Sequence, residues 1–325
     1  MESGFMQKLK MNNYYHMTVR EGLKNFLNRC KRDNLSNFTS RTYEAHINIF
    51  INFVGEDKEV NEIDKQLIDS FVVYLKEERE LKDTSINTYL RSVKSFVNYL
   101  ISINVVRPFN IKFVKENVYY KDVYSDEELE ILLEKPNLKR CTFAEYRTWV
   151  YINFLLGTGC RISTATNVKI QDIDFEGGLI KFNQTKNRNY LIVPLSHRLE
   201  EVLKEYLAYR QGQPEDYLFC NINGEVIAVS TMQQALKSYN KARGIEKTSS
   251  HLFRHTFAKL WILNNGDMFR LQKILGHKSL DMVKKYVNMY TDDLTKDFDK
   301  YNPLEIMSVN KKVNTNKINI RSKKR

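Results

Sequence analysis

The 325-residue chain has few of the residues that mark several classes of protein. Its four cysteines, at positions 30, 141, 160 and 220, are irregularly spaced and form no Cys-x-x-Cys pair, which excludes a disulfide framework and a zinc ribbon. Five prolines and 12 glycines exclude a collagen-like or linker-dominated chain. No apolar run approaches the roughly 18 residues of a membrane span, and the first ten residues lack a signal-peptide core. We therefore expect a reduced, soluble, cytoplasmic protein with no membrane partner.

Basic residues are unevenly distributed along the chain. The net charge is +12, but seven lysines and arginines lie without an acid in residues 311–325, so the overall charge alone says little about partners. Residues 84–115 hold five basic residues and no acid, whereas residues 56–83 hold ten acids against five bases. This asymmetry predicts one positively charged face.

The first hundred residues show helical spacing of apolar residues that predicts four helices. In the fourth helix the apolar side runs from Ile86 to Leu100. Another side has no acid and carries amides and cations at helical spacing, namely Asn87, Arg91, Lys94 and Asn98. Such a stripe is often only a solvated face, but amides and cations bind phosphates, so we interpret these four residues as DNA contacts.

A domain boundary is predicted after Arg107-Pro108-Phe109, because residues from there to Tyr124 show no helical period. The capping-box sequence Ser125-Asp-Glu-Glu128 opens a new helix, and Pro136 ends it. We expect further helices near 143–156, 161–167, 196–210, 231–243, 251–264, 268–275 and 279–290. Two β-like runs, 179–184 and 190–195, flank Lys186-Asn-Arg-Asn189 and predict a hairpin. The resulting fold class is mostly α, with a four-helix domain over 15–106, a linker over 107–124, a mainly helical domain with a small sheet over 125–308, and a basic, disordered tail over 309–325.

His251-Leu-Phe-Arg254-His255 opens one of the predicted helices and could suggest a metal site. A zinc protease would need Glu at position 252, which is Leu, and Arg254 would repel a cation, so we expect no metal and no cofactor. His251 and Arg254 lie on one helical face and present donors suited to a phosphate.

Four other polar residues are unremarkable when each is taken alone. Arg161 follows Gly157-Thr-Gly-Cys160 and is expected at a helix N-terminus, where the helix dipole also favours an anion. Lys186 lies in the hairpin turn, His277 follows Leu275-Gly276, and Tyr286 comes nine residues after His277.

Together these residues resemble the signature of the tyrosine recombinase (lambda-integrase-like) family. The matches include Gly-Thr-Gly-x-Arg-Ile-Ser163, a lysine eight residues before Pro194, His-x-x-Arg-His-Thr-Phe-Ala258, Leu-Gly-His277 and the tyrosine at +9. The resemblance covers roughly residues 15–290 and implies that the first four helices form a SAM-like core-binding domain. It implies a catalytic set of Arg161, Lys186, His251, Arg254, His277 and Tyr286.

The chemistry that this set implies is transfer of a DNA strand to tyrosine. A phenol with a pKa near 10 is a poor nucleophile at neutral pH. Arg161 and Arg254 would favour the phenolate and bind the charged non-bridging oxygens of the transition state. Neighbouring cations favour release of a proton from Lys186, the expected general acid for the leaving 5′ oxygen. The resemblance implies that His251 assists proton transfer, that His277 bonds the phosphate, and that Tyr286 holds DNA by a 3′-phosphotyrosyl bond.

Some positions leave alternatives open. Tyr290 lies one turn beyond Tyr286 and is the rival nucleophile, although the spacing from His277 favours Tyr286. Lys181 and Arg188 are substitutes for Lys186, and Arg188 is also a candidate DNA contact. Thr164 stands where relatives often carry Glu, which bears on how Arg161 or Lys186 is oriented. The apolar residues of 298–307 either pack on their own domain or dock on a neighbouring protomer.

The predicted function is that of a site-specific DNA recombinase, the integrase of a mobile element, acting as a homotetramer on double-stranded DNA attachment sites. The alternatives are a chromosome-dimer-resolving recombinase, a type IB topoisomerase-like nicking and resealing enzyme, and a DNA-binding regulator without catalysis. The four-helix block and the segment after the tyrosine argue against the topoisomerase. The complete catalytic set argues against the regulator.

Overall fold

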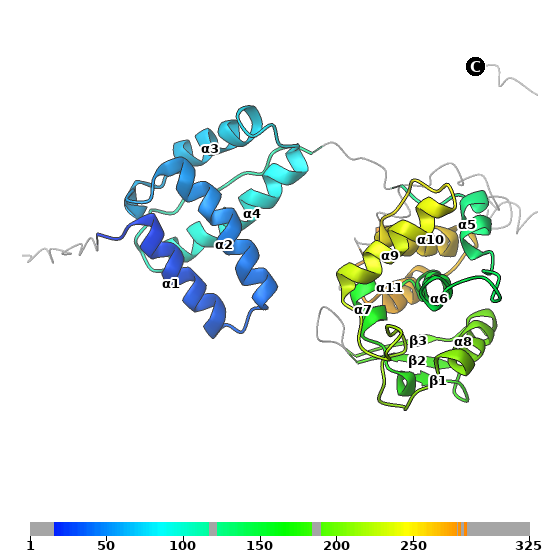
Figure 1. Ribbon diagram of the computed structural model, residues 1–325. Coiled ribbons are helices and arrows are strands. Elements are labelled where there is room, and N and C mark those ends of the chain that lie inside the picture. The colour runs from blue at the N-terminus through cyan, green and yellow to red at the C-terminus, as the bar shows by residue number, and fades with distance from the viewer. Residues whose placement is uncertain (1–15, 117–121, 184–189, 278, 281–282, 285–325) are drawn as a thin grey trace, which may run out of the picture. The chain divides into compact units, whose positions relative to one another are not determined.

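The computed structural model describes residues 16–116, 122–183, 190–277, 279–280 and 283–284. The chain divides into two compact units, Met1–Tyr119 and Tyr120–Arg325 (Figure 1). Both units are mainly helical, and the second contains a small sheet, which confirms the predicted fold class. No helix within the described ranges is both long enough and apolar enough to cross a membrane.

The first unit is a bundle of four α-helices, as its apolar spacing predicts. The helices are α1 (Val19–Arg32), α2 (Asn37–Val54), α3 (Lys65–Glu77) and α4 (Asp83–Ser102), with a short 3₁₀ turn at Val60–Glu62. A capping box between Thr18 and Glu21 starts α1. Helix α4 packs against the other three, and its side from Ile86 to Leu100 is fully buried.

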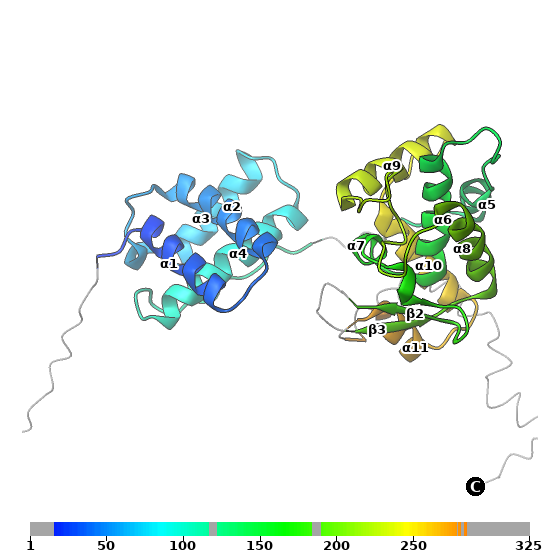
Figure 2. The same cartoon turned by 60° about the horizontal axis from the view of Figure 1, so that its bottom comes forward.

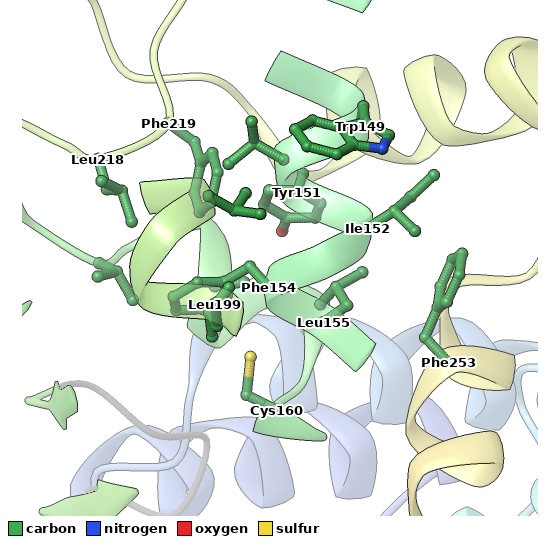
Figure 3. Close-up of a cluster of buried hydrophobic side chains, with 14 of the residues drawn as sticks. Trp149, Tyr151, Ile152, Phe154, Leu155, Cys160, Leu199, Leu218, Phe219 and Phe253 are labelled. Atoms are coloured by element: carbon green, nitrogen blue, oxygen red, sulfur yellow. The ribbon is translucent and has the colours of Figure 1, made fainter. Parts of the chain in front are cut away.

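The second unit is built around a central helix, α6 (Phe143–Thr158). Its buried residues point in all directions, because α5 (Asp126–Leu133), α8 (His197–Arg210), α9 (Val229–Ala242) and α10 (Ser250–Leu263) all pack on it. Figure 3 shows Tyr151, Phe154 and Leu155 of α6 in this core, with Phe253 of α10 nearby. The predicted capping box at the start of α5 is confirmed, since Ser125 and Glu128 bond each other's backbone N–H groups.

Three short antiparallel strands, in the order β1 (Ile173–Asp174), β2 (Leu179–Phe182) and β3 (Leu191–Pro194), form the sheet. The predicted hairpin is β2–β3, with Phe182 opposite Leu191 as the last pair before the turn. Strand β1 is too short for its sequence to reveal, and a 3₁₀ turn at Ile170–Asp172 leads into it. Ile180, Phe182 and Val193 point into the core, so the sheet is attached to the helices through one face.

Two short helices complete the unit, α7 (Ile162–Thr166) and α11 (Met268–Leu275). Figure 2 shows α11 beside β3, on the side of the unit away from α9. Of the helix predicted over 279–290, only residues 279–280 and 283–284 are described. Val283 is fully buried with Ala258, Leu271 and Leu275, so the chain returns to α10 and α11 three residues before Tyr286.

Candidate active site

The turn between α6 and α7 places Arg161. Gly159 ends α6 in the left-handed conformation (φ 61°), and Arg161 is the N-cap residue of α7, at the helix N-terminus where the sequence predicts it. A side chain at position 159 could not fit, because its Cβ would lie 2.5 Å from Phe257 Cδ1 and 2.9 Å from Leu275 Cδ2. The buried hydroxyl of Tyr151 donates to the carbonyl of Ile162 at 2.7 Å and holds α7 in place. The half-buried Arg161 is thus set on a rigid turn.

Arg254 joins three segments that are distant in sequence. Its guanidinium donates to the carbonyl of Gly159 at 2.9 Å and to the carbonyl of Leu275 at 2.7 Å. It also lies 2.7 Å from Nε2 of His277. The side chain is 5% exposed, so these bonds form where little water competes for the donors. Arg254 therefore holds the turn that carries Arg161 and the end of α11 against α10.

His277 lies directly after the C-cap of α11. Gly276 adopts the left-handed conformation (φ 61°), and the backbone N–H of His277 donates to the carbonyl of Gln272 at 3.0 Å. This turn directs the imidazole toward Arg254 rather than along the helix. Three members of the predicted set are connected in this way. Arg254 contacts His277 directly, and it is joined to the turn that carries Arg161 through the carbonyl of Gly159.

Cys160, next to Arg161, is a structural residue. It is buried, and desolvation raises the pKa of its thiol to about 11, although Arg254 partly opposes that shift. A thiol with such a pKa is protonated at neutral pH and is a weak nucleophile. Cys160 therefore adds no charge beside Arg161.

His251 lies in the first turn of α10 and faces the solvent. It lines a polar hollow together with α9 residues and the segment just before α10, namely Ser230, Gln233, Gln234, Lys237, Thr248, Ser249 and Ser250. The sequence analysis missed this surface, although residues 226–245 contain no acid and could have revealed it. Ser249 is the N-cap residue of α10, but its side chain makes no capping bond.

Several predicted residues lie outside the described ranges. They are Lys186 and Arg188 in the hairpin turn, the two candidate nucleophiles Tyr286 and Tyr290, and the segment 298–307. The substitute general acid Lys181 is described. Its ammonium lies 3.6 Å from the carboxylate of Asp174.

The predicted DNA-binding stripe of α4 divides into two pairs. Arg91 and Asn98 are exposed, and Arg91 lies 3.7 Å from Glu116. Asn87 is 2% exposed and exchanges two hydrogen bonds of 2.8 Å with the backbone of Val114. The half-buried Lys94 donates to the carbonyl of Ile111 at 3.0 Å. Asn87 and Lys94 thus hold residues 110–116 on α4. The sequence had assigned these residues to a linker.

Comparison with known proteins shows what this chain resembles. Residues 123–292 match the phage integrase family, and residues 23–105 match the N-terminal SAM-like domain of phage integrases. The chain is 29% identical over 300 residues to the tyrosine recombinase XerC of Thermodesulfovibrio yellowstonii, covering 87% of this chain and 96% of the relative. It is 28% identical over 270 residues to a tyrosine recombinase of Pseudothermotoga lettingae, covering 81% and 90%.

Solved structures share the fold at lower identity. The Tn1549 transposon integrase in complex with transposon right end DNA has a TM-score of 0.68 and 20% identity over 83% of this chain and 94% of that chain. A lambda integrase dimer bound to a COC′ core site also has a TM-score of 0.68, with 17% identity over 83% and 95%.

Proposed function

Because this chain belongs to the phage integrase family and is a tyrosine-type site-specific recombinase, we propose that it cuts and rejoins double-stranded DNA through a 3′-phosphotyrosyl bond on Tyr286. The observation that carries the proposal is the guanidinium of Arg254, which ties the turn bearing Arg161 to the turn bearing His277. Arg161 and His277 on their turns, joined by Arg254 of α10, form a preorganised site for a phosphate. The burial of Val283 brings the chain to this site three residues before Tyr286.

The proposed reaction exchanges one phosphodiester bond for another. The phenolic oxygen of Tyr286 attacks the scissile phosphorus with assistance from His251, which takes up the phenolic proton. The bond between phosphorus and the 5′ oxygen breaks, and Lys186 supplies the proton that the 5′ oxygen needs. Arg161, Arg254 and His277 neutralise the non-bridging oxygens while negative charge develops on them. The phosphotyrosyl bond conserves the energy of the original bond, so the reverse attack by a 5′ hydroxyl rejoins the strand.

DNA bound at His251 would also contact α9, because both line the same hollow. The exposed face of α9 carries amides, hydroxyls and lysines and no acid. A helix of about 10–12 Å diameter fits the major groove, and glutamine can pair with adenine through two hydrogen bonds. We therefore place the α9 face on the DNA next to the cleavage site, in addition to Arg91 and Asn98 of α4.

The identity of the nucleophile is tested with a nicked suicide duplex, which traps the covalent complex. Tyr286→Phe should abolish the trapped complex and leave duplex binding nearly unchanged, because only the attacking oxygen is removed. Tyr290→Phe is the matched control and should retain trapping. Trapping that survives in Tyr286→Phe but disappears in Tyr290→Phe would reverse the assignment. Absence of trapping by the unaltered chain on any duplex would favour the catalytically inactive regulator.

The role of Lys186 is tested with a duplex whose leaving oxygen is replaced by a 5′-bridging sulfur, which departs without a proton. Lys186→Ala should slow cleavage of the ordinary duplex by about 10²–10⁴-fold and should cleave the sulfur duplex at close to the unaltered rate. Arg161→Ala and Arg254→Ala should be slow on both duplexes, because they act on the non-bridging oxygens. Rescue of Lys181→Ala or Arg188→Ala instead would transfer the general acid to that residue.

The biological setting that we propose is integration and excision of a mobile element by a homotetramer on two sites. The basic segment 311–325, beyond the part that matches the family, supports this over chromosome-dimer resolution. The proposal is tested with duplexes taken from both sides of the gene. Strand exchange between two such duplexes supports it and excludes a topoisomerase, whereas exchange only at a site elsewhere in the chromosome supports dimer resolution.

A further inference from the structure

Arg161 and Arg254 are held in the site by different means. The guanidinium of Arg254 is fixed by its bonds to two carbonyls and by its contact with His277. The guanidinium of the half-buried Arg161 makes no hydrogen bond or ion pair within the residues that the structure describes. Its position before DNA binds therefore depends on the backbone of Arg161, the N-cap residue of α7.

Helix α7 is too short to hold that backbone by itself. It has five residues, fewer than two turns, and a helix of this length is not stable in isolation. The backbone N–H groups of Thr164 and Ala165 donate to the carbonyl of Arg161 at 2.9 and 3.0 Å, so Arg161 moves with the helix. No side chain caps its N-terminus. The attachment that fixes α7 must come from the surrounding core.

That attachment consists of two buried hydroxyls that meet at the carbonyl of Ile162, the residue after Arg161. The hydroxyl of Tyr151 on α6 donates to this carbonyl at 2.7 Å, and the hydroxyl of Thr166 on α7 donates to it at 2.8 Å. The two hydroxyl oxygens are 2.8 Å apart. Tyr151 is fully buried and Thr166 is 2% exposed, so little water can replace either bond.

The Tyr151 side chain is itself fixed in the core. It belongs to the central helix of the unit, and its ring packs edge-to-face on Phe219 with the ring centroids 4.6 Å apart (Figure 3). Burial raises the pKa of its hydroxyl well above the usual value, so the group remains a donor at neutral pH. The hydroxyl pair therefore connects the start of α7 to the most rigid part of the unit.

We propose that Tyr151 and Thr166 are positioning residues that set the backbone of Arg161 so that its guanidinium meets a non-bridging oxygen of the scissile phosphate. This inference rests on the proposed role of Arg161 in neutralising that oxygen. Neither hydroxyl touches the DNA, because both are buried in the core. The pair acts by limiting the displacement of α7, and a displacement of about 1 Å at a reacting group can cost about 10²-fold in rate.

The test compares two duplexes in single-turnover cleavage by the full chain. One is ordinary, and in the other a methyl group replaces one non-bridging oxygen of the scissile phosphate, which removes the negative charge that Arg161 neutralises. Arg161→Ala is the reference variant. It should be slow on the ordinary duplex and should approach the rate of the unaltered chain on the methyl duplex. Of the two methyl stereoisomers, the one that best restores Arg161→Ala is used.

Tyr151→Phe should cleave the ordinary duplex about tenfold more slowly than the unaltered chain, a part of the loss that a 1 Å displacement can cause. On the methyl duplex it should be within about threefold of the unaltered chain, because the position of the guanidinium no longer matters there. Binding of the ordinary duplex should not change. Thr166→Val removes the other hydroxyl at nearly constant size and should give the same pattern.

The matched control is Tyr206→Phe. Tyr206 on α8 is also fully buried and also packs on Phe219, but its hydroxyl has no hydrogen-bond partner among the described residues. The same chemical change at this position should leave cleavage of both duplexes normal. Tyr151→Phe keeps the test decisive if Thr166→Val does not fold, because the Thr166 bond to Ile162 remains in it.

Two outcomes would overturn the inference while the recombinase function stands. Equal slowing of Tyr151→Phe on both duplexes would show a general structural role, and normal cleavage of the ordinary duplex would show no role at all. If neither stereoisomer restores Arg161→Ala, the proposed contact of Arg161 is wrong, and the role of the pair falls with it. Absence of any covalent complex with the unaltered chain would instead contradict the proposed function.

Discussion

At the scale of single residues, Arg254, which we propose to be catalytic, also has a structural role. Two N–H groups of its guanidinium donate to the backbone carbonyls of Gly159 and Leu275. A lysine could not replace it, because its single ammonium lacks the fixed fork of donors that binds both carbonyls at once. The positions of Arg161 and His277 depend on the same two carbonyls, since each residue follows one of them by two positions. A small displacement of one turn should therefore affect the entire proposed phosphate site.

Gly159→Ala tests this dependence, and Gly178→Ala is its matched control. Both glycines have nearly the same positive φ, 61° and 62°, but only position 159 lacks room for a Cβ. In both variants backbone strain should lower the free energy of unfolding by about 1–2 kcal/mol. In Gly159→Ala, overpacking against Phe257 and Leu275 should lower it by roughly 1–3 kcal/mol more. Cleavage by Gly159→Ala should also be slower, because the overpacking displaces the turn that carries Arg161. Thermal unfolding and suicide-substrate cleavage measure the two effects. Equal loss of stability in both variants would contradict the tight packing.

At the scale of elements, α9 combines a buried side with an exposed side that we propose to face DNA. Met232, Leu236 and Tyr239 pack into the core, while the opposite side is exposed and free of acids. The sequence of α9 predicts a helix but not its partner, because the hollow forms only when α10 brings His251 beside it. The absence of acids from residues 226–245 is visible in the sequence, as the stripe of α4 is, but the position of α9 beside His251 is not.

Lys237 and Lys241 offer a matched test of the α9 surface. Both are exposed and lie one turn apart, but only Lys237 lines the hollow with His251. Lys237→Ala should reduce the slope of log binding constant against log salt by about one unit, the loss of one phosphate contact, and Lys241→Ala should leave it unchanged. The slope is measured by titrating a labelled duplex at several salt concentrations. Identical slopes for both variants would remove α9 from the DNA interface.

At the scale of the whole molecule, the segment that connects the two units is shortened at both ends, because each unit holds one end of it by hydrogen bonds. Asn87 holds Val114 on the first unit. On the second, the backbone N–H of Tyr124 donates to the buried hydroxyl of Thr256 on α10 at 3.0 Å, two residues after Arg254. Asn87 also donates to the carboxylate of Glu116, and Lys247 pairs with Asp122, so residues 117–121 connect the two attached ends. Two DNA-binding units on a short connection bind one duplex more tightly than they would on a long one.

Asn87→Ala should release residues 112–116, because Lys94 still bonds the carbonyl of Ile111, and should extend the connection from five to about ten residues. Because effective concentration falls roughly as the −3/2 power of length, the affinity for one duplex should fall about threefold. Asn28→Ala, an exposed amide on α1, is the control. A five-residue Gly-Ser insertion after position 119 should reproduce the loss. If the insertion has no effect, the weakening in Asn87→Ala comes from instability of the first unit and not from the longer connection.

The sequence alone determined the class of fold, the β2–β3 hairpin, the capping box at Ser125 and the helix N-terminus at Arg161, because each depends on residues within a few positions of one another. Strand β1 and the end of the first unit escaped prediction, since a two-residue strand and the Asn87–Val114 bonds arise from long-range packing. The sequence also contained Arg161, Arg254 and His277, but only the tertiary structure brought them together through Gly159 and Leu275. The same is true of Tyr151 and Thr166. Local propensity decides which element a residue joins, whereas burial and hydrogen bonding across elements decide which residues share a site.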